Sequence, residues 1–217
     1  PYVAWIAVMI VAPMLMIVLY AFTTAGNDVT TIRFTLDNFA RFFSDQVFLD
    51  VLWRSLFIAV ITTIICVLVG YPIAYAIAQR SEKSNMFWVL VITMPTWINM
   101  MVRTYAWVGI LQDGGLINSL LGLFGIGPFK MMYTTFAVVL GMVYNFIPFM
   151  ILQIHTSLTK MDKSYLEAAA DLGANKVQSF LRVTLPLSLP GVLSGITLVF
   201  LPAVSSFFIP KLLGGGQ

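Results

Sequence analysis

The sequence predicts an all-α polytopic membrane protein, and three observations support this fold class. Apolar residues make up 59% of the chain and charged residues only 10%, and the mean hydropathy is +0.92. A soluble domain carries about 25% charged residues, so this chain lacks the side chains to cover a water-facing surface. Several apolar stretches are long enough to cross a bilayer, and one polar stretch of about thirty residues lies before the last of them.

The apolar stretches predict five spanning helices, at residues 2–22, 55–78, 86–102, 133–154 and 190–208. Pro13 is tolerated in the first, because neighbouring helices can satisfy the carbonyl that it frees. Gly70-Tyr71-Pro72 predicts a bend in the second helix, and Pro95 breaks the third.

The segments between the spans are polar. Residues 28–54 mix charges with aromatic residues near helical spacing, which predicts a short helix at the membrane interface or against the bundle. The turn at 79–85 and the polar stretch at 155–189 are rich in Lys and Arg, which favours the cytoplasm for both. This orientation puts the start of the first span in the cytoplasm.

The polar stretch predicts two short helices joined at a glycine. Ser164 and Glu167 have the spacing of a capping box, and Gly173 is suited to a left-handed helix end. Asn175 can cap a second helix over residues 176–183. Leu185-Pro186 is expected to stop that helix.

The same stretch resembles the EAA loop of ABC-transporter permeases. The resemblance rests on Glu167-Ala168-Ala169, then Gly173, then Val183-Thr184-Leu185-Pro186, with Val183 at the usual Ile position. In that family the loop couples the membrane subunit to a separate ATPase. The resemblance implies a cytoplasmic coupling loop at 155–189 within a single transmembrane domain, 1–217. The coupling residues that it implies are Glu167, Ala168, Ala169, Asp171, Gly173, Val183, Leu185 and Pro186.

Other segments narrow the resemblance to the spermidine/putrescine (PotB-like) permeases of binding-protein-dependent importers. They are residues 68–76, 103–107, 166–174, 201–203 and 208–215. The resemblance implies a type I ABC importer transmembrane domain in the bacterial cytoplasmic membrane, and a sixth helix missing after Gln217. It also implies three kinds of partner: a PotC-like second permease, a PotA-like ATPase dimer and a PotD-like binding protein outside. This sequence has no Gly-x-x-x-x-Gly-Lys-Ser/Thr loop, so ATP and Mg would belong to the ATPase and no cofactor to this chain.

A polyamine pathway needs carbonyl, carboxylate or aromatic groups. The five predicted spans contain no Asp or Glu. The candidates near the midplane or outer mouth are Trp97, Asn99, Tyr105, Asp113, Tyr144 and Asn145. Asn145 is the best of them, because an amide inside a span usually faces a cavity or a partner helix. Arg103 could repel a polycation, pair with an acid on a partner chain, or extend to the interface.

Four alternatives remain. An importer of iron, phosphonates or opines would share the same loop. A stand-alone channel or secondary transporter has no need for a helical coupling surface. A membrane enzyme would need converging acids, histidines or metal ligands, whereas His155 is the only histidine, so no catalytic or metal site is expected. A DNA-binding helix-turn-helix, and with it a nucleic-acid partner, is disfavoured for two reasons. The motif lies between two membrane spans, and few basic residues surround it.

Overall fold

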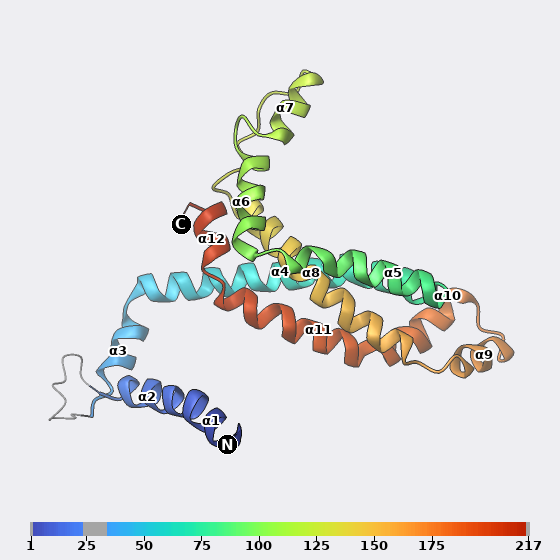
Figure 1. The fold of residues 1–217 in the computed structure, drawn as a ribbon, viewed down its shortest axis with the longest axis horizontal. Coiled ribbons are helices and arrows are strands. Elements are labelled where there is room, and N and C mark those ends of the chain that lie inside the picture. The colour runs from blue at the N-terminus through green and yellow to red at the C-terminus, as the bar shows by residue number, and fades with distance from the viewer. Residues whose placement is uncertain (1, 24–33, 216–217) are drawn as a thin grey trace. The chain divides into compact units, whose positions relative to one another are not determined.

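The computed structural model describes residues 2–23 and 34–215 (Figure 1). The regular elements in these ranges are helices, apart from an isolated antiparallel bridge between Thr23 and Phe34. The all-α prediction is therefore confirmed for the described residues. Contacts divide the chain into two compact units, Pro1–Arg54 and Ser55–Gln217, and each is described by itself. The prediction of a single domain stays a prediction.

The first unit begins with three consecutive helical segments. They are α1 (Tyr2–Ile6), a π-helical segment η1 (Ala7–Val11) and α2 (Ala12–Ala21). Together they match the first predicted span, and Pro13 sits in the first turn of α2. A π segment directly before a proline is a known way to accommodate a missing backbone N–H inside a helical run.

The second helix of this unit is α3 (Asp37–Ser44), which confirms a short helix within residues 28–54. Residues 28–33 of that prediction lie outside the described residues. The amide of Asn38 donates to the carbonyls of Tyr20, Ala21 and Thr23, at 3.3, 3.2 and 2.8 Å. These bonds satisfy carbonyls that the end of α2 leaves open.

The helix α4 (Gln46–Ala78) begins nine residues before the predicted second span. Its start is set by Asp45, whose carboxylate accepts a hydrogen bond from the Val47 N–H at 2.9 Å. No proline or glycine follows until Gly70, so the charged residues 50 and 54 lie within the helix rather than in a connecting segment. The prediction that residues 46–54 lie in a connecting segment before the second span is therefore wrong, because they form the start of α4. Pro72 lies inside a continuous helix.

The third predicted span, 86–102, is helical as far as Trp97 and does not continue as one helix to residue 102, which agrees with the predicted break near Pro95. α5 (Glu82–Thr93) ends in a 3₁₀ segment η2 (Met94–Trp97), and the chain then bends by 88° into α6 (Met100–Leu111) and α7 (Leu116–Leu123). Asn99 starts the new direction, because its side chain accepts from the Met101 N–H at 2.8 Å and caps α6. Residues 100–102 thus belong to the next helix.

The centre of the second unit is α8 (Thr135–Thr159), which packs along α11 (Leu185–Ser205) (Figure 1). A Cβ at Gly191 would lie 2.8 Å from the Gln153 carbonyl oxygen, and one at Gly195 would lie 2.5 Å from the Met150 sulfur. Small residues four apart let two membrane helices approach closely.

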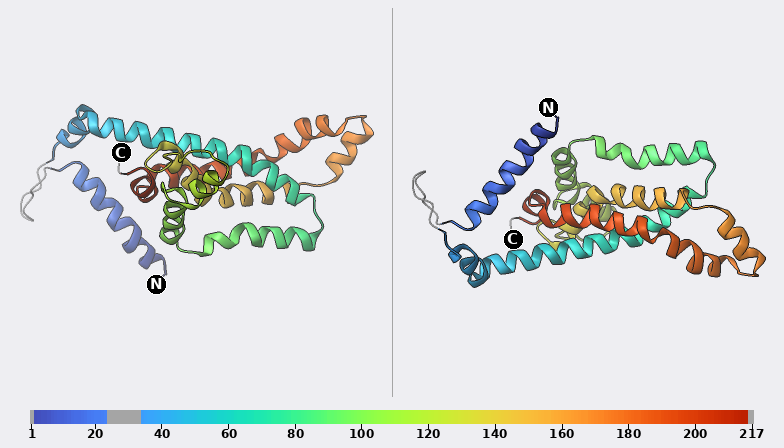
Figure 2. Two further views of the ribbon diagram at one scale, coloured as in Figure 1. Left: turned by 90° about the horizontal axis from the view of Figure 1, so that it is seen from above. Right: turned by 90° about the horizontal axis from the view of Figure 1, so that it is seen from below.

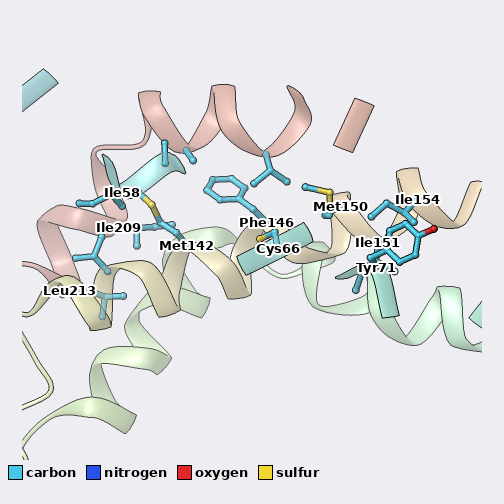
Figure 3. Packing of buried hydrophobic residues seen from close by; sticks show 14 of the residues in the cluster. Ile58, Cys66, Tyr71, Met142, Phe146, Met150, Ile151, Ile154, Ile209 and Leu213 are labelled. Atoms are coloured by element: carbon cyan, nitrogen blue, oxygen red, sulfur yellow. The ribbon is translucent and has the colours of Figure 1, made fainter. Parts of the chain in front are cut away.

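α11 ends at Ser205, and α12 (Phe208–Leu213) follows after a break. The buried core joins α4, α8 and α12 (Figure 3). Its members include Ile58, Cys66, Met142, Ile209 and Leu213, which Figure 3 labels. α8 supplies the middle of this core and contacts the helices on either side.

Within the described residues, three helices are long and apolar enough to cross a membrane. They are Gln46–Ala78, Thr135–Thr159 and Lys176–Ser205. The bent pair Glu82–Trp97 and Met100–Leu123 would make a fourth, and Ala7–Ala21 is a shorter apolar helix. The number five therefore stays a prediction.

Candidate functional site

The polar stretch forms a helical hairpin between α8 and α11. It consists of α9 (Ser164–Asp171), a turn at Gly173, and α10 (Lys176–Ser179). Figure 2 shows this hairpin at the end of the second unit away from α6 and α12. The other predicted cytoplasmic turn lies at the same end, because His155 Nε2 and Asn85 Oδ1 are 2.8 Å apart. The two segments predicted to share one side of the membrane are thus at one end of the bundle.

The start of α9 differs from the prediction. Ser164 is the first helical residue rather than the cap, and the Asp162 carboxylate accepts from its N–H at 2.9 Å. This hydrogen bond lowers the pKa of the Asp162 carboxyl below its ordinary value. The predicted capping box is wrong because the helix begins one residue too early for it. Glu167 is therefore not used as a cap, and its side chain is exposed.

The end of α9 is as predicted. Gly173 has a φ of 78°, in the left-handed region. Its N–H donates to the Ala170 carbonyl at 2.9 Å, and the Ala174 N–H donates to Ala169 at 3.0 Å. This pair of bonds is the Schellman motif, which satisfies the last carbonyls of a helix and reverses the chain.

The start of α10 is also as predicted, and more fully than expected. Asn175 Oδ1 accepts from the Gln178 N–H at 2.9 Å, and Gln178 Oε1 accepts from the Asn175 N–H at 3.0 Å. The two residues form a reciprocal capping box. The reversal between α9 and α10 is thus held by backbone and side-chain bonds on both sides.

Leu185-Pro186 does not stop the second helix, which corrects the prediction. α10 continues through a π-helical segment η3 (Phe180–Thr184) into α11. Pro186 lies in the first turn of α11, directly after the π segment, as Pro13 does in α2. The wider π turn removes the need for the N–H that proline lacks. The second arm of the hairpin is therefore one helical run with the span that follows.

The eight predicted coupling residues fall into two groups. Those on α9 and its end are Glu167, Ala168, Ala169, Asp171 and Gly173, and all are exposed except the half-buried Ala169. Val183, Leu185 and Pro186 lie at the base, where η3 meets α11. Leu185 packs against the buried core. The first group can meet another protein, and the second connects it to the bundle.

Sequence reasoning missed four exposed apolar side chains on the hairpin. They are Tyr165, Leu172, Val177 and Leu181, with exposed fractions of 55%, 88%, 66% and 53%. Leu172 stands at the corner between the two helices. The signal was present as apolar residues inside an otherwise polar stretch. Exposed apolar side chains beside charges, at the end of a membrane bundle, are typical of a protein–protein contact surface.

The opposite end of the unit holds a pocket of about 480 Å³ where two helix breaks meet. One break lies between η2 and α6, and the other between α11 and α12. The pocket is lined by Asn99, Met100, Met101, Phe146, Pro202 and residues 205–208. Polar groups at broken membrane helices are a usual setting for substrate sites in transporters.

The six predicted pathway residues are not gathered into one site. Asn99 is the one that lines this pocket. Trp97 and Tyr105 are 70% and 59% exposed, and Asp113 lies in the exposed turn after α6. The Tyr144 ring packs against Trp107, with centroids 5.4 Å apart.

Asn145 is buried in the helix packing, with 2% of its surface exposed. Its Nδ2 donates to the Gly141 carbonyl at 2.8 Å, and its Oδ1 has no partner among the described residues. Asn145 does not line this pocket, and the expectation that it faces a cavity or a partner helix stays a prediction. Arg103 Nε and Nη1 and Ser206 Oγ are likewise buried without a partner in the described ranges.

Comparison with known proteins assigns the fold to a family. The model of the family described as "Binding-protein-dependent transport system inner membrane component" matches residues 70–217, which include the hairpin and both helix breaks. The chain belongs to this family. As a family member it is an inner membrane transport component with several apolar helices, which is the expected setting for its composition.

Relatives agree with this assignment. The chain is 38% identical to the spermidine/putrescine transport system permease protein PotB of Salmonella typhimurium, over 99% of this chain and 76% of the relative. It is 37% identical to PotB of Escherichia coli K12, over 99% and 79%. It is 31% identical to the inner membrane ABC transporter permease protein YdcU of the same organism, over 90% and 66%. These relatives are transport permeases rather than enzymes.

Two solved structures share the fold. One is a bacterial ABC transporter involved in the import of alginate, with a TM-score of 0.70 and 17% identity over 96% of this chain and 72% of the other. The second is an alginate ABC transporter in complex with a pentasaccharide-bound periplasmic protein, with a TM-score of 0.72 and 16% identity over 88% and 66%. At this identity the likeness shows the fold of an importer permease.

Proposed function

We propose that this chain is the permease subunit of an ATP-driven polyamine importer in the bacterial cytoplasmic membrane. The observation that carries the proposal is the helical hairpin at one end of the bundle, with its exposed apolar side chains and the free Glu167 carboxylate. The substrate class follows the spermidine/putrescine names of the PotB relatives. Uptake of iron, phosphonates or opines instead would revise the substrate and leave the coupling role in place.

The partners of the proposal follow from the coupling role. A PotA-like ATPase dimer in the cytoplasm would bind the hairpin and supply the ATP and Mg chemistry. A PotC-like permease would pair with this chain, and a PotD-like binding protein would deliver substrate from outside. Leu172, at the corner of the hairpin, is suited to insert into an apolar groove of the ATPase, with Glu167 beside a basic group.

The mechanism is the movement of a stiff lever. α8 and α11 approach closely at Gly191 and Gly195, and the hairpin joins their ends. The turn between α9 and α10 is held by capping bonds on both of its sides, so a push on α9 would move α8 and α11 rather than unfold the loop. Tilting these helices would open and close a cavity between the two permeases, which is alternating access by rigid-body motion.

The pocket at the two helix breaks is our proposed part of the substrate pathway. α11 ends there, and the carbonyl end of a helix carries a partial negative charge that favours an ammonium group. Asn99, Ser205 and Ser206 add polar groups to a mostly apolar lining, a combination that suits a flexible polyamine. Trp97, Tyr105, Asp113, Tyr144 and Asn145 stay predictions for the rest of the pathway.

The decisive experiment replaces Glu167 in the reconstituted complex. We expect Glu167→Ala to lower ATP-dependent spermidine uptake into proteoliposomes about tenfold, because a contact with a charged partner group is removed. Glu82→Ala is the matched control, since Glu82 is also an exposed glutamate in the first turn of a helix at this end. It should leave uptake unchanged.

Two results would contradict the proposal. One is a Glu167→Ala complex that takes up spermidine at the wild-type rate and keeps the ATPase subunits bound. The other is spermidine uptake by this chain alone without ATP, which would identify a stand-alone channel or secondary transporter.

A further inference from the structure

α4 contacts the lever formed by α8 and α11 in a different way from the contact between those two helices. The backbones of α8 and α11 run close together, whereas α4 meets them through side chains. One point of contact is Gly70, where a Cβ would lie 3.2 Å from the Met150 side chain. A helix held by side chains can shift relative to a lever more easily than one held by close backbone packing.

A buried hydrogen bond joins α4 to α11. The hydroxyls of Tyr71 and Ser188 are 2.7 Å apart, and both side chains are buried. The Ser188 hydroxyl donates to the Leu185 carbonyl at 3.0 Å, so the Tyr71 hydroxyl is the donor to Ser188. Ser188 lies two residues after Pro186, at the base of the hairpin. The other hydrogen bond from α4 to a different helix, in the described ranges, ends on the weakly accepting sulfur of Met142, at 3.8 Å.

An aromatic contact reinforces the same junction. Phe180, the first residue of η3, packs edge-on against Tyr71 at 5.8 Å and against Tyr75 at 5.2 Å between ring centroids. Phe180 therefore lies between the hairpin and α4. Tyr71 belongs to the same buried cluster as Ile151 and Ile154 of α8, which Figure 3 also labels.

We infer that Tyr71 is a positioning residue that transmits movement of the hairpin to α4. It lies directly before Pro72, where the helix has lost a backbone hydrogen bond and bends most easily. The aromatic contact with Phe180 carries a push from η3, and the hydrogen bond to Ser188 makes α4 follow α11. This inference rests on the proposed coupling function and assigns to one hydroxyl a role within it.

The test separates transport from ATP hydrolysis. Tyr71→Phe removes the hydroxyl and keeps the ring, so the core stays filled and the Ser188 hydroxyl keeps its bond to Leu185. We expect spermidine transported per ATP hydrolysed to fall about fivefold in proteoliposomes, the factor that corresponds to one buried hydrogen bond. Complex yield and basal ATPase activity should stay at the wild-type level and the melting temperature should fall by no more than a few degrees, whereas a purely structural role would leave the transport-to-ATP ratio unchanged.

Tyr75→Phe is the matched control. Tyr75 lies one turn further along the same helix and also packs on Phe180, and its hydroxyl makes no hydrogen bond within the described residues. Tyr75→Phe should keep the wild-type ratio of spermidine transported to ATP hydrolysed. Ser188→Ala should lower the ratio, and Tyr71→Phe combined with Ser188→Ala should be no worse than the lower single variant, because both remove one interaction.

The inference fails if Tyr71→Phe and Tyr75→Phe have the same ratio while Glu167→Ala still lowers uptake. It also fails if Tyr71→Phe lowers transport and ATP hydrolysis in equal proportion. Failure of the proposed function has a different signature, since the wild-type complex would then show no ATP-dependent uptake, or Glu167→Ala would have no effect.

Discussion

The two ends of the unit Ser55–Gln217 are built differently. At the hairpin end, helix turns are closed by capping bonds, and glycines bring α8 and α11 together. At the other end, two helices break around a pocket. Three side chains near this end hold buried polar atoms that have no partner in the described part of the chain. They are Arg103 of α6, Asn145 of α8 and Ser206 at the break between α11 and α12.

The difference between the two ends suits the two roles in the proposed function, which are transmission of force and passage of a solute. A segment that transmits force must not unfold or repack when pushed, so satisfied caps and close packing suit it. A segment that admits a polar solute must rearrange, and buried polar groups without partners lower the cost of leaving the present arrangement. In the proposed function, one chain would combine a stiff end that transmits force with an end that rearranges around the solute. The following predictions test this comparison, from the largest expected effect to the smallest.

The largest effect is expected at Gly191. Gly191→Ala places a Cβ 2.8 Å from the Gln153 carbonyl, which is backbone and cannot rotate away. We expect the two helices to separate, at a cost of about 1–3 kcal/mol, and the complex to lose thermal stability and transport. Melting temperature and yield of the purified complex measure this. Gly109→Ala is the control, because an added Cβ there meets nothing within 4 Å. An unchanged melting temperature for Gly191→Ala would show that the lever is not closely packed.

An intermediate effect is expected from two buried asparagines. Asn118 is satisfied on both sides, donating to the Phe129 carbonyl at 3.0 Å and accepting from its N–H at 2.9 Å. Asn118→Leu should cost about 1–2 kcal/mol, because it leaves the Phe129 backbone groups unpaired. Asn145→Leu removes one bond to the Gly141 carbonyl and a buried Oδ1 that has no partner among the described residues, so stability should fall less than for Asn118→Leu while uptake slows.

Melting temperature and spermidine uptake, measured on both variants, separate the two cases. Normal uptake by the Asn145→Leu complex would remove Asn145 from the pathway. Equal loss of stability in the two variants would show that the Oδ1 of Asn145 is satisfied in the assembled complex.

The smallest effect is expected at Asp162. Its folded pKa lies below the ordinary value, so its cap on α9 contributes fully above about pH 4 and is lost as the pH falls through the folded pKa. The protection of amides at the start of α9 against exchange, taken relative to the intrinsic exchange rate at each pH, should therefore fall on acidification. Asp162→Asn keeps a capping side chain and should remove the pH dependence. Persistence of that dependence in the variant would assign it to another group.

Short-range chemistry made much of the hairpin predictable. Gly173 is the residue that tolerates the left-handed region, and Asn175 can cap α10 with its own side chain. The start of α9 was less predictable, because Asp162 and Ser164 are both good caps and differ by only two positions. The family was readable from the spacing of Glu167, Gly173 and Pro186, a pattern that needs no tertiary information.

Helix ends beside proline were the main source of error. Proline predicts a stop at Pro186 and a break at Pro95, but only the second occurs. A π turn absorbs the missing N–H at Pro186, and that choice depends on how the following span packs against α8. The start of α4 has no proline or glycine beside it. It is set instead by the hydrogen bond from the Val47 N–H to the Asp45 carboxylate.

By itself the sequence determined the membrane setting, the helical class and the helical hairpin of α9 and α10, because composition and local capping act over a few residues. Only the tertiary structure decided that Tyr71 meets Ser188 and Phe180, and that Asn145 is packed away from the pocket. It also decided that, of the predicted pathway residues, Asn99 lines this pocket and the others do not. These facts join residues that are distant in the chain, and no local preference of one residue specifies which partner it will pack against.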